Sequence, residues 1–168
     1  MTTVTPRPGV RSESAAVSVR HAGRSDAAAL YRLSVPFVRE GALRDRPAGV
    51  YARDAADFLV AEAAQGGLEG CVALRLRPDV HGRAAAVLYN FCVAEGSQGR
   101  GVGSALLRAV LGEATARGVS RVFTATAGGG ELFLRHGFAP GGEEEAPPRW
   151  RARLDPARGS RVLVRSLA

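Results

Sequence analysis

The residues from 98 to 104 form the part of the sequence with the most recognisable chemistry. They read QGRGVGS, and they lie between an apolar run and a segment with helical periodicity. Glycine permits positive φ angles and lets a ligand approach the main chain closely. The first N–H groups of a helix have no acceptor within the helix, so a turn of this kind can bind an anion. The alternative interpretation is a tight turn in which the glycines serve packing alone.

The spacing of the glycines restricts which anionic ligand fits this turn. The pattern is G-x-G-x-G, whereas the dinucleotide fingerprint is G-x-G-x-x-G after a parallel βαβ unit, and the strands before this turn are predicted to be antiparallel. The chain has no lysine, which excludes a Walker-type phosphate loop and Schiff-base chemistry. A pyrophosphate-containing ligand other than NAD or a Walker-bound nucleotide therefore suits the turn best.

The composition describes a water-soluble, single-domain protein with an unusual choice of basic residue. The chain has 168 residues, of which 46% are hydrophobic, and all 23 of its Lys and Arg positions are arginine, with a net charge of +7. Arginine binds phosphates through bidentate forks, which favours CoA, nucleotides or RNA as partners. A GC-rich genome that replaces lysine by arginine explains the substitution equally well, although it does not explain the excess of charge.

Targeting and redox signals are absent from the sequence. The N-terminus lacks the apolar segment of a signal peptide and no run is long enough to span a membrane, so we expect a cytoplasmic protein. Cys71 and Cys92 lie in apolar strand-like runs without metal-ligand spacing, which predicts buried, reduced thiols and no metal site. Residues 1–15 are rich in Thr, Pro, Ser and Gly and are expected to be a disordered tail, followed by one domain over 16–168.

The periodicity along the chain predicts an α/β fold of the α+β kind. The strongest helix covers 101–118, with Val102, Ala105, Leu106, Ala109 and Val110 at helical spacing and Gly118 as its C-cap. A first helix starts at Ser25 or Asp26, and the segment 35–56 is expected to be irregular, interrupted by Pro36 and Pro47, with one or two short helical pieces. The predicted strands cover 16–22, 57–63, 68–78, 84–94, 120–127 and 160–167, with a short helix over 130–138 that runs into another strand.

At this point the sequence resembles the GNAT (Gcn5-related N-acetyltransferase) superfamily. Gln98, Gly101 and Gly103 match its Gln/Arg-x-x-Gly-x-Gly/Ala signature after the fourth strand, and LFLRHGF resembles its aromatic helix that ends in Gly-Phe. The resemblance covers 16–168. It implies a mixed, mostly antiparallel sheet of six or seven strands, flanked by about four helices and splayed between strands 4 and 5.

The resemblance also implies acetyl-CoA as co-substrate, with no metal. Main-chain N–H groups near Asn90 to Val93 would stabilise the oxyanion as an amine attacks the thioester. The residues implied to contact the cofactor are Phe91, Cys92, Val93, Gln98, Gly99, Arg100, Gly101, Val102, Gly103, Ser104 and Phe133.

Three stretches resemble, within that superfamily, the acetyltransferase domain of bacterial N-acetylglutamate synthases. They are VPFVREGALRDR, GELFLRHGF and ARGSRVLVRSL. On this resemblance Arg46, Arg158 and Ser160 fall where the family binds the carboxylates of its amino-acid substrate, and an arginine fork with a hydroxyl suits that task. The implied acceptor is a small amino-acid-like amine, with glutamate as one option, and a homodimer is plausible by the same resemblance.

The proton acceptor is not identified by the resemblance. The carboxylate expected as general base on the fourth strand falls at Val87, and the tyrosine that many GNAT enzymes use as an acid falls at Phe133. The candidates for catalysis are Tyr89, Asn90 and Glu40. Tyr89 could instead be a core aromatic, and Glu40 a solvated loop carboxylate. His81 and His136 are weaker candidates, as a surface residue and a helix cap.

Three functions are therefore compatible with the sequence. The first is an acetyl-CoA-dependent N-acetyltransferase that acts on a small amino-acid-like amine. The second is a GNAT-fold acyltransferase with an aminoacyl-tRNA as donor, motivated by the missing base and by the six arginines between Arg149 and Arg165. The third is a catalytically inactive CoA-binding module.

Overall fold

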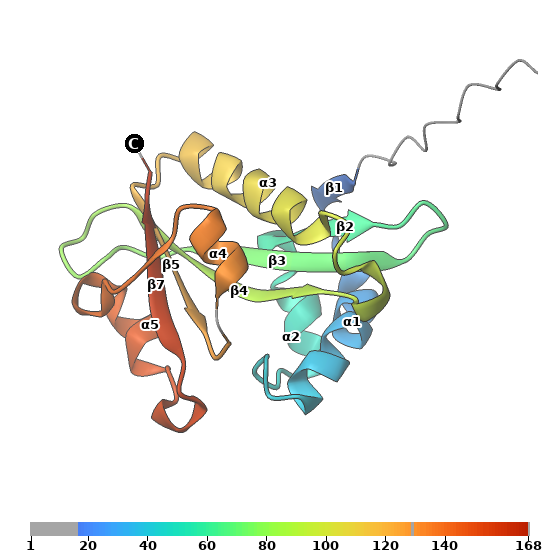
Figure 1. Ribbon diagram of the computed structural model, residues 1–168, viewed down its shortest axis with the longest axis horizontal. Coiled ribbons are helices and arrows are strands. Elements are labelled where there is room, and N and C mark those ends of the chain that lie inside the picture. The colour runs from blue at the N-terminus through green and yellow to red at the C-terminus, as the bar shows by residue number, and fades with distance from the viewer. Residues whose placement is uncertain (1–16, 129, 168) are drawn as a thin grey trace, which may run out of the picture.

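The computed structural model of the protein describes residues 17–128 and 130–167, so the predicted tail over residues 1–15 lies outside the described residues. Seven strands form one sheet in the order β1-β2-β3-β4-β5-β7-β6, drawn in Figure 1. The strands are β1 (Ser18–His21), β2 (Phe58–Glu62), β3 (Leu68–Leu76), β4 (Ala85–Val93), β5 (Arg121–Thr126), β6 (Ala139–Pro140) and β7 (Arg161–Ser166). All neighbouring strands are antiparallel except β4 and β5, which are parallel. The expected mixed, mostly antiparallel sheet is confirmed.

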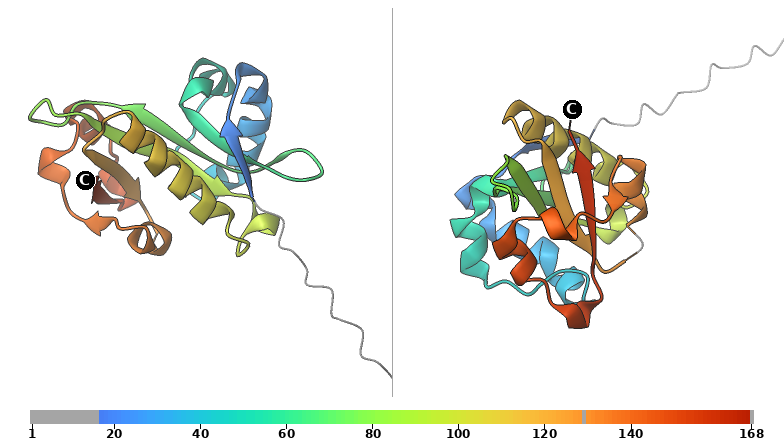
Figure 2. Two further views of the ribbon diagram at one scale, coloured as in Figure 1. Left: turned by 90° about the horizontal axis from the view of Figure 1, so that it is seen from above. Right: turned by 90° about the vertical axis from the view of Figure 1, so that its left-hand side faces the viewer.

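In the described part of the chain, five α-helices accompany the sheet, one more than the approximate number expected. They are α1 (Ala27–Arg39), α2 (Ala48–Arg53), α3 (Val102–Ala116), α4 (Glu131–Arg135) and α5 (Pro148–Ala152). The helices α1 and α2 cover one face of the sheet, and α3 covers the other, as the two views of Figure 2 show. No helix within the described ranges is long and apolar enough to cross a membrane.

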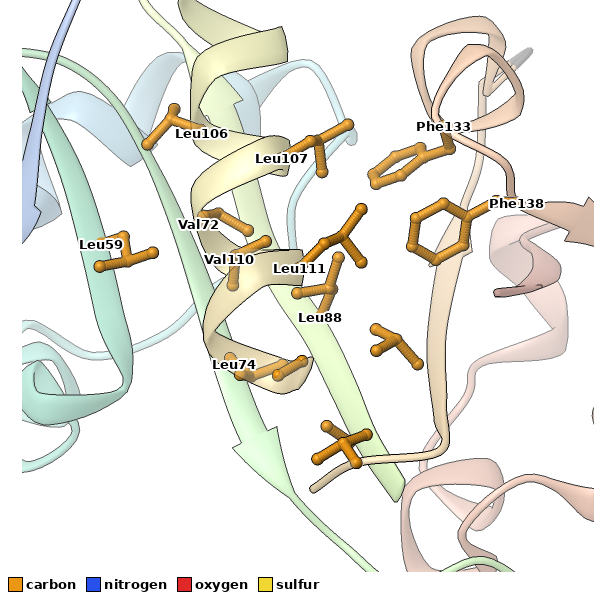
Figure 3. Close-up of a cluster of buried hydrophobic side chains, with 14 of the residues drawn as sticks. Leu59, Val72, Leu74, Leu88, Leu106, Leu107, Val110, Leu111, Phe133 and Phe138 are labelled. Carbon is orange, nitrogen blue, oxygen red and sulfur yellow. The ribbon is translucent and has the colours of Figure 1, made fainter. Parts of the chain in front are cut away.

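The largest part of the core lies between α3 and the sheet. Leu106, Leu107 and Val110 of α3 are fully buried and pack with residues of β2, β3 and β4 and with Phe133 and Phe138 (Figure 3). The buried face of α3 is rotated from the expected one, because Ala105 and Ala109 are only half-buried whereas Leu107 and Leu111 are buried. Large aliphatic side chains bury more apolar area than alanine, so they decide which face of the helix turns inward.

The sheet divides into two halves between β4 and β5. Their parallel ladder pairs only Ala85 to Val87 with Arg121 to Phe123. Beyond Val87, β4 continues to pair with β3, while β5 continues to pair with β7 as far as Thr126. In Figure 1, β3 and β4 accordingly run at a steep angle to β5 and β7. The expected splay between strands 4 and 5 is present.

The first helix is longer than the sequence indicated. The interruption expected at Pro36 does not occur, because α1 continues through Pro36 to Arg39. Pro36 is exposed, so its ring projects away from the sheet, while Leu33 and Phe37 on either side pack against the core under α1. Tertiary packing of these apolar neighbours offsets the loss of one helical hydrogen bond.

Gly70 on β3 sets how closely α3 approaches the sheet. A Cβ atom there would lie 2.9 Å from Cδ1 of Leu106, 3.2 Å from Cγ1 of Val102 and 3.0 Å from the main-chain oxygen of Cys92. The main-chain oxygen cannot move without distorting β4. Glycine at this position therefore serves close packing of helix on strand.

We expect Gly70→Ala to destabilise the protein by about 1–3 kcal/mol, because the added methyl group overpacks this contact. Gly112→Ala in α3 is the matched control: nothing lies within 4 Å of a Cβ there. Alanine is the better helix former, so the control should gain about 0.5–1 kcal/mol. Urea unfolding measures both changes, and equal stability of the two variants would contradict this account.

Candidate active site

The glycine turn leaves a row of main-chain amides without partners. After β4 the chain makes a short 3-10 turn and reaches Gly99 and Gly101, whose φ angles are +76° and +83°. No N–H from Gly99 to Ser104 donates a hydrogen bond to an acceptor among the described residues. The side-chain Nε2 of Gln98 donates to the Val93 carbonyl at 3.1 Å, which ties the turn to the end of β4. Successive free amides at a helix start form an anion-binding concavity.

The two interpretations of the glycines apply to different positions in the turn. Nothing lies within 4 Å of a Cβ built on Gly99 or Gly101, so these two glycines supply backbone conformation and open space. A Cβ on Gly103 would lie 2.7 Å from Cδ2 of Leu132 and 3.3 Å from Cζ of Phe91, so Gly103 serves packing.

Other residues expected around the cofactor support the turn rather than face solvent. Phe133 is buried, and its ring lies 5.4 Å from that of Phe91, centre to centre. Cys92 is buried under α1, where its Sγ lies 3.7 Å from Sγ of Cys71. The hydrogen bond with Cys71 and burial raise the pKa of the Cys92 thiol. Cys92 can therefore offer a cofactor only its main chain, and both cysteines are free thiols, as predicted.

Ser104 and Arg100, also expected at the cofactor, have side-chain partners. Oγ of Ser104 lies 3.1 Å from Nε2 of His136, and Arg100 lies 3.8 Å from a carboxylate oxygen of Glu69. Burial is the main cause that lowers the pKa of His136, and nearby arginines add to it. A neutral His136 suits a role in holding the Ser104 hydroxyl at the start of α3.

A bulge in β4 lies at Asn90, where the strand leaves β5. The register with β3 shifts between Cys71, which faces Cys92, and Ala73, which faces Tyr89. Asn90 has a φ of +49°, and it is the one non-glycine residue with positive φ in the described part of the chain. Asparagine tolerates this left-handed conformation better than most residues, so its type fits the bulge.

The Asn90 side chain is buried and fully engaged by hydrogen bonds. Its Nδ2 donates to Oγ of Ser34 at 3.0 Å, and its Oδ1 accepts from Arg46 at 3.0 Å and from the Tyr51 hydroxyl at 3.3 Å. Asn90 thereby joins the bulge, α1 and the segment before α2. This amide is placed to fix the Arg46 guanidinium.

Tyr89 lies between two arginines. The guanidinium carbons of Arg46 and Arg75 lie 5.2 Å and 5.0 Å from its ring centre. Its hydroxyl donates to Asp57 at 2.5 Å and accepts from Arg75 at 2.9 Å. Burial and the neighbouring Asp57 carboxylate raise the pKa of Tyr89 well above its usual range. At neutral pH the hydroxyl is therefore protonated and cannot accept a proton from an amine.

A cavity of about 590 Å³ opens beside the splayed end of β4. One wall comes from the segment before α2 and from α2 itself, and the other from α5 and the segment that leads to β7. Eight arginines and three aspartates line it: Arg44, Arg46, Arg53, Arg75, Arg77, Arg149, Arg153, Arg158, Asp45, Asp54 and Asp155. The excess of cations makes it a site for an anionic ligand.

The three residues expected to bind substrate carboxylates all line this cavity, although more than a hundred positions separate Arg46 from Arg158 and Ser160. Arg46 forms no ion pair with a carboxylate of the described residues, and burial lowers the pKa of its guanidinium. Arg158 donates to the main-chain oxygen of Gly41 at 2.9 Å and so bridges the two walls.

The catalytic candidates from the sequence differ in whether they line the cavity. Tyr89 and Asn90 line the cavity, as does Val87, which stands where a family carboxylate was expected. Glu40 ends α1 in an exposed position and is not among the described residues that line the cavity.

Sequence reasoning missed Arg75 and Asp57, and it connected the arginines of α5 only with a tRNA partner. In the sequence, Arg75 is a single charged residue near the end of the apolar run of β3. No spacing pattern indicates that it contacts Asp57. Its guanidinium lies 2.7 Å from Asp57 and 2.9 Å from Asp54. Hydrogen bonds with Arg53, and then Arg75, lower the pKa of Asp54, which keeps it ionised.

Comparison with known protein families agrees with this architecture. The family model described as an acetyltransferase (GNAT) domain matches residues 54–140, which is more than half of the chain. The chain therefore belongs to the GNAT acetyltransferase family.

Two curated relatives are both named amino-acid acetyltransferase. The protein from Neisseria meningitidis serogroup B is 30% identical over 157 residues, which cover 93% of this chain and 35% of the relative. The protein from Ralstonia nicotianae is 32% identical over 149 residues, which cover 89% of this chain and 32% of the relative. The chain thus spans about a third of the length of the curated relatives that it matches.

Solved structures extend the likeness. N-acetylglutamate synthase from Neisseria gonorrhoeae, complexed with coenzyme A and N-acetyl-glutamate, is 29% identical with a TM-score of 0.81, over 92% of this chain and 36% of that one. A Mycobacterium tuberculosis protein in complex with CoA is 23% identical with a TM-score of 0.73, over 90% of this chain and 99% of that one. The second likeness concerns the fold alone.

We expect both Asn90→Ala and Asn90→Gly to lower the free energy of unfolding by about 1–3 kcal/mol, because Ser34 and Arg46 lose buried hydrogen-bond partners. The alanine variant should be the less stable of the two by about 1–2 kcal/mol, since its Cβ remains in a left-handed conformation that glycine adopts freely. Urea unfolding of both variants measures the difference. An alanine variant as stable as the glycine variant would show that the bulge relaxes once the amide is removed.

Proposed function

We propose that this chain is an acetyl-CoA-dependent N-acetyltransferase that acetylates the amine of a small, negatively charged amino acid, with glutamate as one candidate. One observation carries the proposal: a row of free main-chain amides follows the end of β4, and an arginine-lined cavity is lined by the part of the same strand that has left β5. Membership of the GNAT family and likeness to amino-acid acetyltransferases support it.

The donor side of the proposal uses the glycine turn and the end of β4. The amides from Gly99 to Ser104 bind the diphosphate of acetyl-CoA, with the dipole of α3 adding roughly 0.3–1 kcal/mol. The thioester end of the arm enters the gap beyond Val87, where β4 lacks a ladder partner on its β5 side. Main-chain amides between Asn90 and Val93 then stabilise the oxyanion.

The acceptor side uses the cavity. Arg46, Arg158 and Ser160 bind the α-carboxylate, because Arg46 has no ion-pair partner of its own among the described residues. Within the same residues, the Arg158 side chain forms one hydrogen bond, to Gly41. A substrate carboxylate supplies the charge that Arg46 lacks. Orientation of the amine against the thioester accounts for much of the rate enhancement.

Tyr89 and Asn90 enter the proposal as positioning residues. Asn90 fixes the Arg46 guanidinium through a hydrogen bond, and Tyr89 supports Arg46 and Arg75 on its ring. The amine proton passes to water in the cavity, since Val87 offers no carboxylate and Asp54 is held in ion pairs with arginines. Glu40 has no part in this scheme.

The donor side is tested by Gly101→Ala. An alanine in this left-handed position is strained by about 1–2 kcal/mol, and the turn must shift its amides to relieve the strain. We expect the Kd for CoA, measured by calorimetry, to rise about tenfold. Gly66→Ala is the matched control, because Gly66 has a φ of +87° and equally open surroundings in the β2–β3 hairpin. Equal CoA affinity of the two variants would contradict the assignment of the turn.

The acceptor side is tested by release of CoA from acetyl-CoA in the presence of a panel of acidic, neutral and basic amino acids. We expect acidic amino acids to be acetylated fastest, at a rate that rises with pH up to the pKa of the acceptor ammonium, because the neutral amine attacks. Arg46→Gln should raise the KM for the acidic acceptor about 10- to 100-fold, which is the loss of a charged hydrogen bond. Arg32→Gln, an exposed change on α1, is the control for this variant. If CoA is released with none of the amines in the panel, the proposed function is wrong.

A further inference from the structure

Four arginines that line the cavity have no ion pair or side-chain hydrogen bond among the described residues. One of them, Arg44, lies two positions before Arg46, and the other three lie outside that segment. Arg77 follows the end of β3, and Arg149 and Arg153 lie on α5 and at its C-terminal end. All three line the cavity, and none forms an ion pair or a side-chain hydrogen bond with a described residue. The proposed α-carboxylate site of Arg46, Arg158 and Ser160 does not include them.

Several other arginines around the cavity have acidic or carbonyl partners. Arg83 and Arg121 share the buried Asp79 and Glu145, and Arg53 and Arg75 share Asp54. Arg151, which lies between Arg149 and Arg153 in the sequence, donates to the Glu143 carbonyl. Arg77, Arg149 and Arg153 thus differ from these neighbours in having no side-chain partner among the described residues.

Arg149 and Arg153 are exposed, and each adds a positive charge to the cavity wall. They are four residues apart on a helical segment, so they lie on the same side of it, and like charges at this spacing repel. Trp150, between them, lines the cavity and packs with its ring 6.4 Å from that of the buried Phe123, centre to centre. This contact anchors α5 to the core and holds the two guanidinium groups on the cavity wall.

The cavity has room for a ligand larger than a free amino acid. At about 590 Å³ it falls within the range of roughly 300–1,000 Å³ that is typical of pockets for ligands much larger than a free amino acid. Asp45, Asp54 and Asp155 offset only part of the charge of the eight arginines. A ligand that fills the cavity therefore has to bring more than one anionic group.

We propose that Arg77, Arg149 and Arg153 form a second anion subsite, and that the preferred acceptor is an amine longer than glutamate with a carboxylate or phosphate at the end remote from its α-carboxylate. This inference rests on the proposed function. Carboxylate and phosphate share the oxyanion geometry that arginine forks recognise.

The first experiment measures kcat/KM for CoA release with a series of acceptors. Alanine carries no second anion, glutamate and 2-aminopimelate carry a carboxylate at increasing distance, and O-phosphohomoserine carries a phosphate. We expect 2-aminopimelate or O-phosphohomoserine to exceed glutamate at least tenfold, and the better of the two identifies the group bound. A preference for glutamate over both longer acceptors would overturn the proposal.

The double variant Arg149→Gln/Arg153→Gln tests the subsite itself. It should lower kcat/KM for the preferred long acceptor about tenfold or more and change that for alanine less than twofold. Arg151→Gln is the matched control, since this exposed arginine of the same helix does not line the cavity, and it should change neither value. An equal loss for alanine and the long acceptor would overturn the subsite.

A binding measurement separates this inference from the proposed function. Pimelate has two separated carboxylates and no amine, so its binding by calorimetry does not depend on acetyl transfer. We expect it to bind more tightly than acetate and to lose about tenfold in affinity in the double variant. Acetylation of glutamate together with unchanged pimelate affinity in the double variant would leave the function standing and refute the subsite.

Discussion

The short ladder between β4 and β5 is the constraint on which the site depends. Three residue pairs hold these parallel strands together, and after Val87 each strand follows its other neighbour. The bulge at Asn90 gives β4 the local twist that this divergence requires. The cavity is lined by the part of β4 beyond this ladder, and the glycine turn follows the end of the same strand.

The same bulge connects the main chain of β4 to the charged cavity. The buried Asn90 amide bonds to Arg46, and the adjacent Tyr89 lies under Arg46 and Arg75 while its hydroxyl meets Asp57. A buried amide that is fully satisfied is a rigid support, because any movement would leave a polar group unpaired. The guanidinium of Arg46 is therefore held in place before a ligand arrives.

Much of the fold followed from local patterns, whereas parts of the site did not. The glycine turn, the order of strands and the splay were predictable. Glycine spacing, periodicity and the motifs of the family each depend on residues that are close together in the sequence. The cluster of Tyr89, Asp57 and Arg75 joins three separate elements, and no periodicity encodes such a contact. The continuation of α1 through Pro36 depended on packing of Leu33 and Phe37, which a local rule for proline cannot anticipate. A tRNA partner, a homodimer and a cytoplasmic location stay predictions.

The two walls of the cavity come from stretches far apart in the chain, and the Arg158 side chain reaches from one to the other. The amide turn belongs to a third stretch that shares no residue with either wall. Under the proposed function, substitutions in the α5 segment change the acceptor side and leave the amide turn that binds the cofactor unaltered. This separation allows the proposed acceptor specificity to change through substitutions in α5 alone, while the residues of the amide turn stay the same.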